Sequence, residues 1–164
     1  MDTDLSPPPA AANTASADWL ALDHQLCFAL YSTSLAMTKL YKPLLEPMGL
    51  TYPQYLVMLV LWEQKPDGEA LTVSALGERL NLDSGTLTPL LKRLEAAGLI
   101  TRKRDAGDER RVRVQPTSAG RALRVQALRI PPTIACATQC ELHEISQLTQ
   151  RLTVLRGQLQ QAKA

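Results

Sequence analysis

The sequence predicts a mainly α-helical protein with one small β-hairpin. Aromatic residues make up only 4% of the 164 residues and apolar residues 45%, a composition that favours a helical core over long alternating strands. In most segments the apolar residues recur every three or four positions, as on one face of a helix. The exception is a pair of short apolar runs within residues 99–114, which flank a charged loop and predict the hairpin.

The N-terminal third of the chain predicts two helices. Apolar residues spaced by three or four positions indicate an amphipathic helix from Leu20 to about Leu40. Pro43 and the run Pro47-Met48-Gly49 are expected to bracket and end a short helix. Thr51 is a suitable N-cap for the next helix, which runs from Tyr52 to about Glu63. That helix is apolar on nearly every side, so we expect it at the centre of the core.

The middle of the chain predicts two helices joined by a tight turn. A short helix opens at Thr72 or Val73 and ends at Leu80, and Ser84 then caps a second helix that runs through Ala97. This is the outline of a helix-turn-helix. The hairpin, with strands at 99–102 and 111–114, follows at once and would form a wing. A winged helix-turn-helix is therefore expected over residues 72–116.

The C-terminal part predicts further helices. Thr117 or Ser118 caps a helix that Pro131-Pro132 is expected to break, and a last helix runs to about Gln160. We expect a single domain over residues 18–163, in which residues 20–48 and 117–163 supply N- and C-terminal dimerisation helices. Residues 1–17 have too little apolar surface to bury and are expected to form a disordered tail.

Composition also limits where the protein acts. The longest apolar run is far shorter than the roughly 20 residues that cross a bilayer, and the N-terminus lacks a secretory pattern. We therefore expect a cytoplasmic protein that does not contact a membrane. Three cysteines in a reducing compartment favour thiol chemistry or plain burial over structural disulfides.

Charge is concentrated in the middle of the chain. Residues 72–129 carry 12 Lys or Arg against 6 Asp or Glu, although the whole chain has a net charge of only +2. A basic segment between acidic flanks is typical of a nucleic-acid-binding module. Charge alone is equally consistent with a solvated surface.

Two long stretches resemble a known family. The stretch LDSGTLTPLLKRLEAAGLITRKRDAGDERRVRVQPTSAG resembles the recognition helix and wing of the MarR family of transcriptional regulators. Pro116 departs from the pattern, which usually has Leu there. The stretch LDHQLCFALYSTSLAMTKLYKPLLEPMGLTYPQYLVMLVLWE is similar to the organic-hydroperoxide-sensing repressors within that family, of the two-cysteine type.

The resemblance implies a homodimer that binds a double-stranded DNA operator. Hydroxyl side chains near the start of the second helix can bond base edges or phosphates, and a helix N-terminus attracts phosphate. Wing arginines can reach a narrow minor groove or the DNA backbone. The expected DNA-binding residues are Ser84, Thr86, Thr88, Lys92, Arg93, Arg110 and Arg111. Asp108 cannot bind phosphate and is expected to stabilise the wing by orienting Arg110 or the hairpin.

The expected redox sensor is Cys27. It lies early in the first helix, where the helix dipole favours a thiolate, and Tyr31 follows four residues later on the same helix face. The resemblance implies that Tyr41 and Tyr52, from the partner subunit, also stabilise the thiolate. The alternative is an inert buried cysteine, which is common in protein cores, but the LCFALY context favours the sensor.

The other two cysteines are candidates to resolve an oxidised Cys27. A hydroperoxide would convert Cys27 to a sulfenic acid, with which a second thiol can condense. Cys136 and Cys140 are both candidates, and the resemblance favours Cys136. A helix could also align Cys136, Cys140 and His143 for zinc, but a fourth ligand is not apparent, so no metal or cofactor is expected.

The expected function is therefore a transcriptional repressor released from DNA when organic hydroperoxides oxidise Cys27. One alternative is a related repressor released by a small phenolic ligand. A thiol peroxidase is a second alternative from another class, but the chain shows no βαβ pattern or CxxC motif, so we do not expect an enzyme. A purely architectural DNA binder, without a redox response, is a third.

Overall fold

The computed structural model describes residues 19–65, 68–105, 107–108 and 110–162. The predicted tail at 1–17 lies outside these residues, as do residues 66–67 of the loop that follows the second predicted helix. The chain divides into two compact units, Met1–Met37 and Thr38–Ala164.

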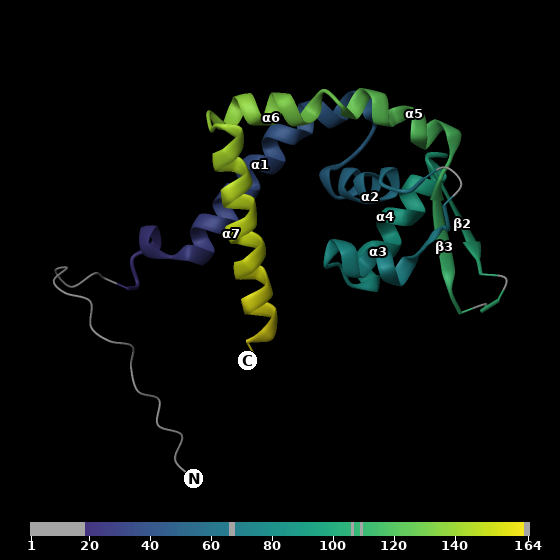
Figure 1. The fold of residues 1–164 in the computed structure, drawn as a ribbon, viewed down its shortest axis with the longest axis horizontal. Helices are drawn as coiled ribbons and strands as arrows, with labels where there is room; N and C mark the ends of the chain where they lie inside the picture. The colour runs from purple at the N-terminus through teal and green to yellow at the C-terminus, as the bar shows by residue number, and fades with distance from the viewer. Residues whose placement is uncertain (1–18, 66–67, 106, 109, 163–164) are drawn as a thin grey trace, which may run out of the picture. The chain divides into compact units, whose positions relative to one another are not determined.

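The described elements confirm the predicted class, mainly α with a small β wing. In chain order they are η1 (Leu22–His24), α1 (Leu26–Leu45), η2 (Glu46–Met48), α2 (Tyr52–Trp62), β1 (Leu71–Thr72), α3 (Val73–Leu80), α4 (Ser84–Ala96), β2 (Ile100–Arg104), β3 (Val112–Pro116), α5 (Ser118–Ala127), α6 (Ile130–Thr138) and α7 (Leu142–Gln161) (Figure 1). No helix in the described ranges combines the length and apolar character that crossing a membrane requires.

Helix α1 differs from its predicted bounds at both ends. A separate 3-10 turn, η1, precedes it, so the α-helix begins at Leu26 rather than at Leu20. It also runs past Pro43 to Leu45, although an interior proline removes one backbone hydrogen bond and crowds the preceding turn. Leu45 is completely buried, and burial of a leucine stabilises by about 1.5–3 kcal/mol. That burial offsets much of the cost of the proline.

Helix α2 forms the centre of the core, as predicted. Thr51 is its N-cap, and the backbone N–H of Thr51 donates to Gln54 Oε1 at 2.8 Å within a capping box. Val57, Met58 and Leu61 are completely buried. The helix contacts α3, α4, α5 and β3, so it positions both the helix-turn-helix and the wing.

The helix-turn-helix is present, with one corrected cap. Thr72 caps α3, and Asn81 ends it in the left-handed conformation, at φ 54°. Asp83, not Ser84, is the N-cap of α4, because its side chain accepts the backbone N–H of Thr86. A carboxylate can accept that bond as well as a hydroxyl can, which is why sequence alone left the choice between adjacent residues open to error. The buried face of α4 is formed by Leu87, Leu90, Leu91 and Leu94, as predicted.

The wing is a three-stranded antiparallel sheet with strand order β1-β3-β2. Only β2 and β3 were predicted. The third strand, β1, contains just two residues, paired Leu71 with Val114 and Thr72 with Arg113. Two residues are too few to show an alternating pattern, so the sequence gives no signal for this strand.

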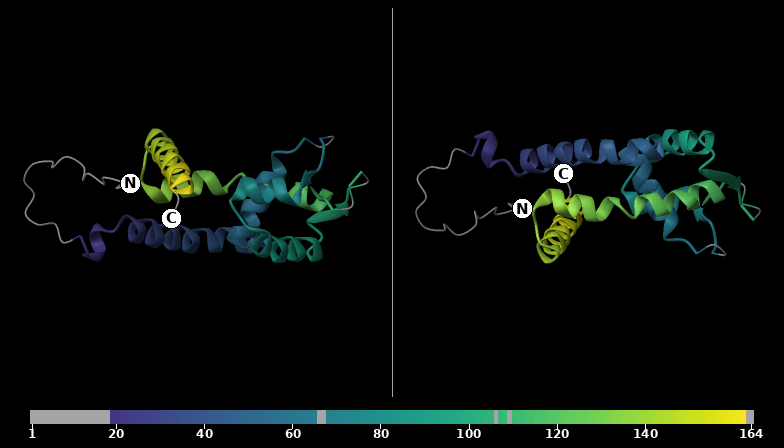
Figure 2. Two further views of the ribbon diagram at one scale, coloured as in Figure 1. Left: turned by 90° about the horizontal axis from the view of Figure 1, so that it is seen from below. Right: turned by 90° about the horizontal axis from the view of Figure 1, so that it is seen from above.

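The C-terminal helices also differ from prediction at the proline pair. Thr117 caps α5, which ends at Ala127, and the helix is interrupted at Leu128 and Arg129. Pro131 and Pro132 lie in the first turn of α6, where proline is tolerated because the N–H groups there have no helical partner. Gln139, at φ 53°, then separates α6 from α7, which turns away from α6 in every view (Figure 1, Figure 2).

Candidate functional site

The start of α4 is organised around the side chain of Asp83. Its Oδ1 accepts the backbone N–H of Thr86 at 2.9 Å, and its Oδ2 accepts the Thr86 hydroxyl at 2.8 Å. These bonds, the backbone bond first, lower the pKa of Asp83. Part of the phosphate-attracting capacity that we predicted for this helix end is therefore already taken by an internal carboxylate. Thr86 and Ser84 are both exposed, but the hydroxyl proton of Thr86 is used in its bond to Asp83.

The other predicted contacts on α4 lie beside its buried leucine face. Ser84, Thr88 and Lys92 are spaced by four residues and so share one face of the helix. Thr88 is half-buried and Lys92 is exposed, as is Arg93 one residue further on. The predicted α4 residues therefore lie on both flanks of the buried leucine face rather than on a single side, with Thr86 and Arg93 on the flank away from Ser84, Thr88 and Lys92.

The tip of the wing is organised around Asp108. Its Oδ1 accepts the backbone N–H of Arg110 at 3.0 Å, its carbonyl oxygen accepts the N–H of Arg111 at 2.9 Å, and its carboxylate lies 3.4 Å from Arg111 Nε. The side chains of Arg110 and Arg111 are exposed. Asp108 therefore holds the turn that presents both arginines.

An ion pair that the sequence analysis missed joins α4 to the wing. Arg102 of β2 donates from Nε and Nη2 to Glu95 Oε2 at 2.9 and 2.5 Å, and its backbone N–H donates to Glu95 Oε1 at 3.2 Å. The side-chain bonds to Arg102 lower the pKa of Glu95. In the sequence, Arg102 is only one of the 12 basic residues of segment 72–129. This ion pair fixes the wing relative to α4.

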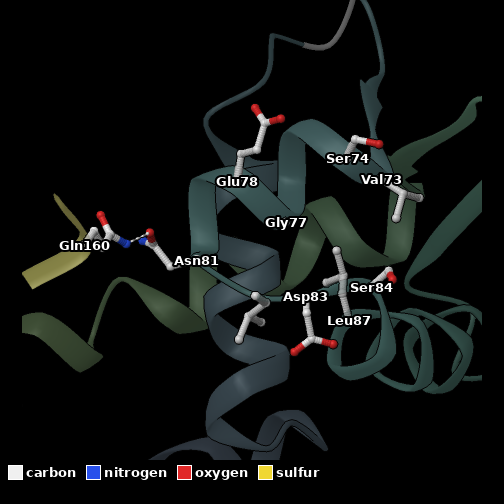
Figure 3. A pocket seen from close by; sticks show the side chains of 10 residues that line it. Val73, Ser74, Gly77, Glu78, Asn81, Asp83, Ser84, Leu87 and Gln160 are labelled. Atoms are coloured by element: carbon white, nitrogen blue, oxygen red, sulfur yellow. Dashed lines mark hydrogen bonds between the residues drawn. The ribbon is translucent and has the colours of Figure 1, made fainter. Parts of the chain in front are cut away.

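A pocket of about 510 Å³ lies between α3 and α4 (Figure 3). Gln160, near the end of α7, closes one side of it and donates from Nε2 to Asn81 Oδ1 at 2.8 Å. Asn81 is the left-handed residue that ends α3. The last turn of α7 therefore contacts the turn of the helix-turn-helix directly.

All three cysteines are exposed and carry free thiols. Cys27 is the second residue of α1, and Tyr31 is exposed four residues later in the same helix. Cys136 lies in α6, and Cys140 lies between α6 and α7, where its thiol contacts the carbonyl oxygen of Thr138 at 3.3 Å.

The single helix that could have aligned Cys136, Cys140 and His143 for zinc does not exist. The chain leaves the α-helical conformation at Gln139, and His143 belongs to α7. In the part of the chain that the structure describes, no group of three or more potential metal ligands comes together.

Two of the three predicted tyrosines lie together with a third that the sequence analysis assigned only to the core. The ring centroids of Tyr41 and Tyr52 are 4.7 Å apart, and those of Tyr41 and Tyr55 are 5.8 Å apart. Burial, with smaller effects from Tyr52 and Tyr55, raises the pKa of Tyr41 to about 12. Burial also raises the pKa values of Tyr52 and Tyr55. These phenols thus remain neutral hydrogen-bond donors at any physiological pH.

A cavity of about 500 Å³ adjoins Tyr52, formed by the end of α1, the turn at η2 and the start of α2. Its lining consists of Thr38, Lys39, Lys42, Glu46, Gly49, Leu50, Thr51, Tyr52 and Pro53. It combines an aromatic wall with two lysines at its edge.

Comparison with known proteins identifies the family. The profile of a family described as "Transcriptional regulator SarA/Rot" matches residues 39–125. The organic hydroperoxide resistance transcriptional regulator of Bacillus subtilis is 49% identical over 144 residues, which are 88% of this chain and 95% of the relative. The chain belongs to the MarR family of transcriptional regulators. Within the MarR family, this relative confirms the predicted hydroperoxide-sensing subgroup, while the two-cysteine type stays a prediction.

Solved MarR-family structures share the fold. Reduced AbfR of Staphylococcus epidermidis bound to DNA has a TM-score of 0.66 and 32% identity, and the match covers 86% of this chain and 96% of AbfR. AbfR with a disulfide formed has a TM-score of 0.56 and 34% identity, covering 82% and 91% of the two chains. The winged helix-turn-helix is thus shared with a MarR-family protein seen both on DNA and oxidised.

Proposed function

We propose that this MarR-family regulator binds its operator as a homodimer and leaves it when an organic hydroperoxide oxidises Cys27. The observation that carries the proposal is an exposed thiol in the first turn of α1, in a chain 49% identical to a hydroperoxide resistance regulator. The site of action would be the cytoplasm, where DNA and reductants are both present.

DNA binding would use α4 in the major groove and the wing beside it. Ser84, Thr86, Lys92 and Arg93 are exposed on α4, and the ion pair between Glu95 and Arg102 holds the wing to that helix. A helix fits the major groove, and wing arginines suit a narrow minor groove or the DNA backbone. Two such units in a dimer would contact half-sites about 34 Å apart.

The thiol chemistry needs only the peroxide and a second thiol. The Cys27 thiolate attacks the outer oxygen of the hydroperoxide, the O–O bond breaks, and the alkoxide takes up a proton to leave as an alcohol. Cys27 is then a sulfenic acid. A second thiolate attacks its sulfur, and hydroxide leaves as water once it takes up a proton, so that a disulfide remains. We assign the second thiol to Cys136, with Cys140 as the alternative.

Helix α7 offers a route from this chemistry to the DNA-reading helices. It begins two residues after Cys140, and its last turn bonds to Asn81 in the helix-turn-helix. A disulfide at Cys136 or Cys140 that shifts α7 would therefore also move or release the turn between α3 and α4. Because both half-sites must fit at once, a coupling of about 3 kcal/mol would lower operator affinity more than a hundredfold.

The test combines mass spectrometry with a gel shift on DNA from upstream of the protein's own gene. After treatment with cumene hydroperoxide, we expect a peptide that links Cys27 to Cys136 and loss of the shifted band, both reversed by dithiothreitol. Cys136→Ser should abolish the link, and Cys140→Ser serves as the matched control. If DNA binding is lost with no linkage of Cys27 to either cysteine, the two-cysteine route is wrong.

One observation favours a second candidate, a repressor released by a small phenolic or other aromatic acid. The cavity beside Tyr52 has an apolar wall for a ring, and Lys39 and Lys42 could pair with an acidic group. A ligand sensor would still be released after Cys27→Ser, whereas a peroxide sensor would not. A thiol peroxidase, the candidate from another class, would instead consume hydroperoxide repeatedly with a thiol reductant.

A further inference from the structure

Arg113 is the second residue of β3, the central strand of the wing sheet. It is paired with Thr72 of β1 on one side and with Lys103 of β2 on the other. In the sequence it is one of several arginines in the basic segment, and nothing distinguishes it from Arg110 or Arg111. Its surroundings do, because its side chain is 27% exposed whereas that of Arg111 is 64% exposed.

The guanidinium of Arg113 joins two segments that are far apart in sequence. Its Nη1 donates to Glu69 Oε1 at 2.5 Å and to the carbonyl oxygen of Ala70 at 3.1 Å, both in the segment before β1. Its Nε donates to Asp105 Oδ2, at the base of the wing turn. Hydrogen bonds to the two carboxylates raise the pKa of Arg113.

Asp105 links Arg113 to the wing turn through hydrogen bonds of its own. Its Oδ1 accepts the backbone N–H of Gly107 at 2.8 Å, and its own N–H donates to the carbonyl oxygen of Arg111 at 2.9 Å. The bond from Gly107 and that from Arg113 both lower its pKa. Asp105 is thus bonded to both sides of the turn, and its carboxylate is 13% exposed.

The charge of this cluster argues against a direct role in DNA binding. Arg113 carries one positive charge, whereas Glu69 and Asp105 carry two negative charges, and both Nε and Nη1 of the guanidinium are already engaged. A phosphate that approached the guanidinium of Arg113 would meet both carboxylates at the same place. An isolated two-stranded hairpin is only marginally ordered, and β1 adds just two residues to it, so a side-chain brace has an evident mechanical purpose.

We propose that Arg113 is a positioning residue for DNA binding. It braces the wing against the segment before β1, so that the turn presents Arg110 in a fixed direction, and it does not contact DNA itself. The proposal rests on the proposed DNA-binding function of the wing.

A double-mutant cycle on operator affinity tests this role. The probe is the duplex from upstream of the protein's own gene, and the variants are Arg113→Ala, Arg110→Ala and the double variant of the full chain. Loss of a wing arginine contact is expected to raise Kd roughly tenfold. We expect Arg113→Ala alone to weaken binding by about that factor, and by less than about twofold in the Arg110→Ala background, because it acts through the wing tip.

Two further variants separate the brace from general stability. Arg79→Ala is the matched control, since it removes an Arg–Glu pair of 2.6 Å with Glu63 away from the wing and should leave Kd unchanged. Glu69→Gln weakens the brace, because it removes the negative charge from a side chain that is 79% exposed. If Arg113→Ala does not fold, Glu69→Gln should still weaken binding, by a smaller factor that disappears in the Arg110→Ala background.

The outcomes that overturn the inference are distinct from those that overturn the proposed function. Equal losses in both backgrounds would show that Arg113 contacts DNA independently, and unchanged Kd in both Arg113→Ala and Glu69→Gln would show that the brace has no role. In either case the regulator function stands. If the unaltered protein does not bind the duplex, both proposals fail.

Discussion

The clearest constraint at the scale of single residues is on Tyr41. Its ring packs between Tyr52 and Tyr55, and burial raises the pKa of its phenol from 10.0 to about 12. A protonated phenol can donate a hydrogen bond to a thiolate while it remains uncharged. The predicted thiolate-stabilising role therefore requires that Tyr41 keep its proton throughout the physiological range.

An alkaline titration tests the state of Tyr41. Because the folded pKa is raised, the buried neutral phenol stabilises the fold fully below pH 10, and this stabilisation is lost as the pH rises through about 12. We expect the absorbance change of tyrosinate that is missing in Tyr41→Phe to be centred near pH 12. Urea unfolding should show a steeper loss of stability above pH 10 in the unaltered protein than in Tyr41→Phe. A difference signal centred at pH 10 would contradict the packing described for this ring.

Gly120 shows how closely two backbone segments approach at the base of the wing. A Cβ on Gly120 would lie 2.0 Å from the carbonyl oxygen of Leu99, which itself accepts the N–H of Thr117 at 3.0 Å. The carbonyl of Gly120 accepts the indole N–H of Trp62 at 2.8 Å. Neither side of this contact can move without breaking a hydrogen bond.

We therefore predict that Gly120→Ala is strongly destabilising. Overpacking against backbone should lower the free energy of unfolding by about 3 kcal/mol or more. Gly157→Ala is the control, because a Cβ there meets nothing within 4 Å, and in a helix interior it should raise stability by up to about 1 kcal/mol. Urea denaturation of both variants measures the difference, and equal midpoints would refute the close approach.

At the scale of helices and strands, the sequence predicted α4 and the long wing strands better than the helix ends and the cap. The leucine spacing of α4 and the two long wing strands were predicted correctly because they repeat regularly. The helix ends and the cap depend on burial or on local hydrogen bonds, which produce no repeating pattern in the sequence. Burial of Leu45 stabilises α1 beyond Pro43. Asp83, rather than its neighbour Ser84, is the N-cap of α4. The left-handed Gln139 separates the helices that contain Cys136 and His143.

The candidate site divides in the same way. Residue type and spacing pointed to the arginines of the wing turn and to the hydroxyls of α4. The structure places these residues on exposed surfaces, except for Thr88, which is half-buried. Nothing in the residue pattern indicates that Arg102 and Arg113 are engaged with carboxylates, because their partners lie seven or more residues away. Tyr55 was missed as part of the tyrosine cluster because its position in an apolar helix is explained by core packing alone.

The contact between α7 and the helix-turn-helix yields a prediction about elements. Gln160→Ala removes the only hydrogen bond between these two elements in the described part of the chain, on an exposed surface where the loss of stability should be below about 0.5 kcal/mol. If α7 transmits oxidation to the turn at Asn81, the variant should bind the operator but need more oxidation to release it. Gln158→Ala, on the same helix, is the control. The peroxide dependence of a gel shift measures this, and identical curves would exclude the route.

At the scale of the whole molecule, exposed apolar residues indicate a surface that a second chain could cover. Several lie on α7, where Leu148, Leu152 and Leu159 are 56%, 39% and 61% exposed. Spaced by four and seven residues, they form one stripe along the helix. An apolar stripe of this kind is typical of an oligomer interface, which supports the proposed homodimer.

A charge placed in that stripe should dissociate the dimer. We expect Leu152→Glu to be monomeric by light scattering at concentrations where the unaltered protein is dimeric, and to bind the operator at least a hundredfold more weakly, because half of the DNA contacts are lost. Gln150→Glu, on the opposite side of α7, adds the same charge as a control. A dimeric Leu152→Glu would place the interface elsewhere.

The central claim is that one thiol couples hydroperoxide to DNA release, and a gel shift with Cys27→Ser tests it most directly. The variant differs from the protein by one exposed atom, sulfur for oxygen, so operator affinity should be unchanged in reducing buffer. We predict that cumene hydroperoxide releases the unaltered protein from the duplex, reversibly with dithiothreitol, and leaves Cys27→Ser bound at every peroxide concentration. Release of Cys27→Ser by the same concentrations would contradict the account.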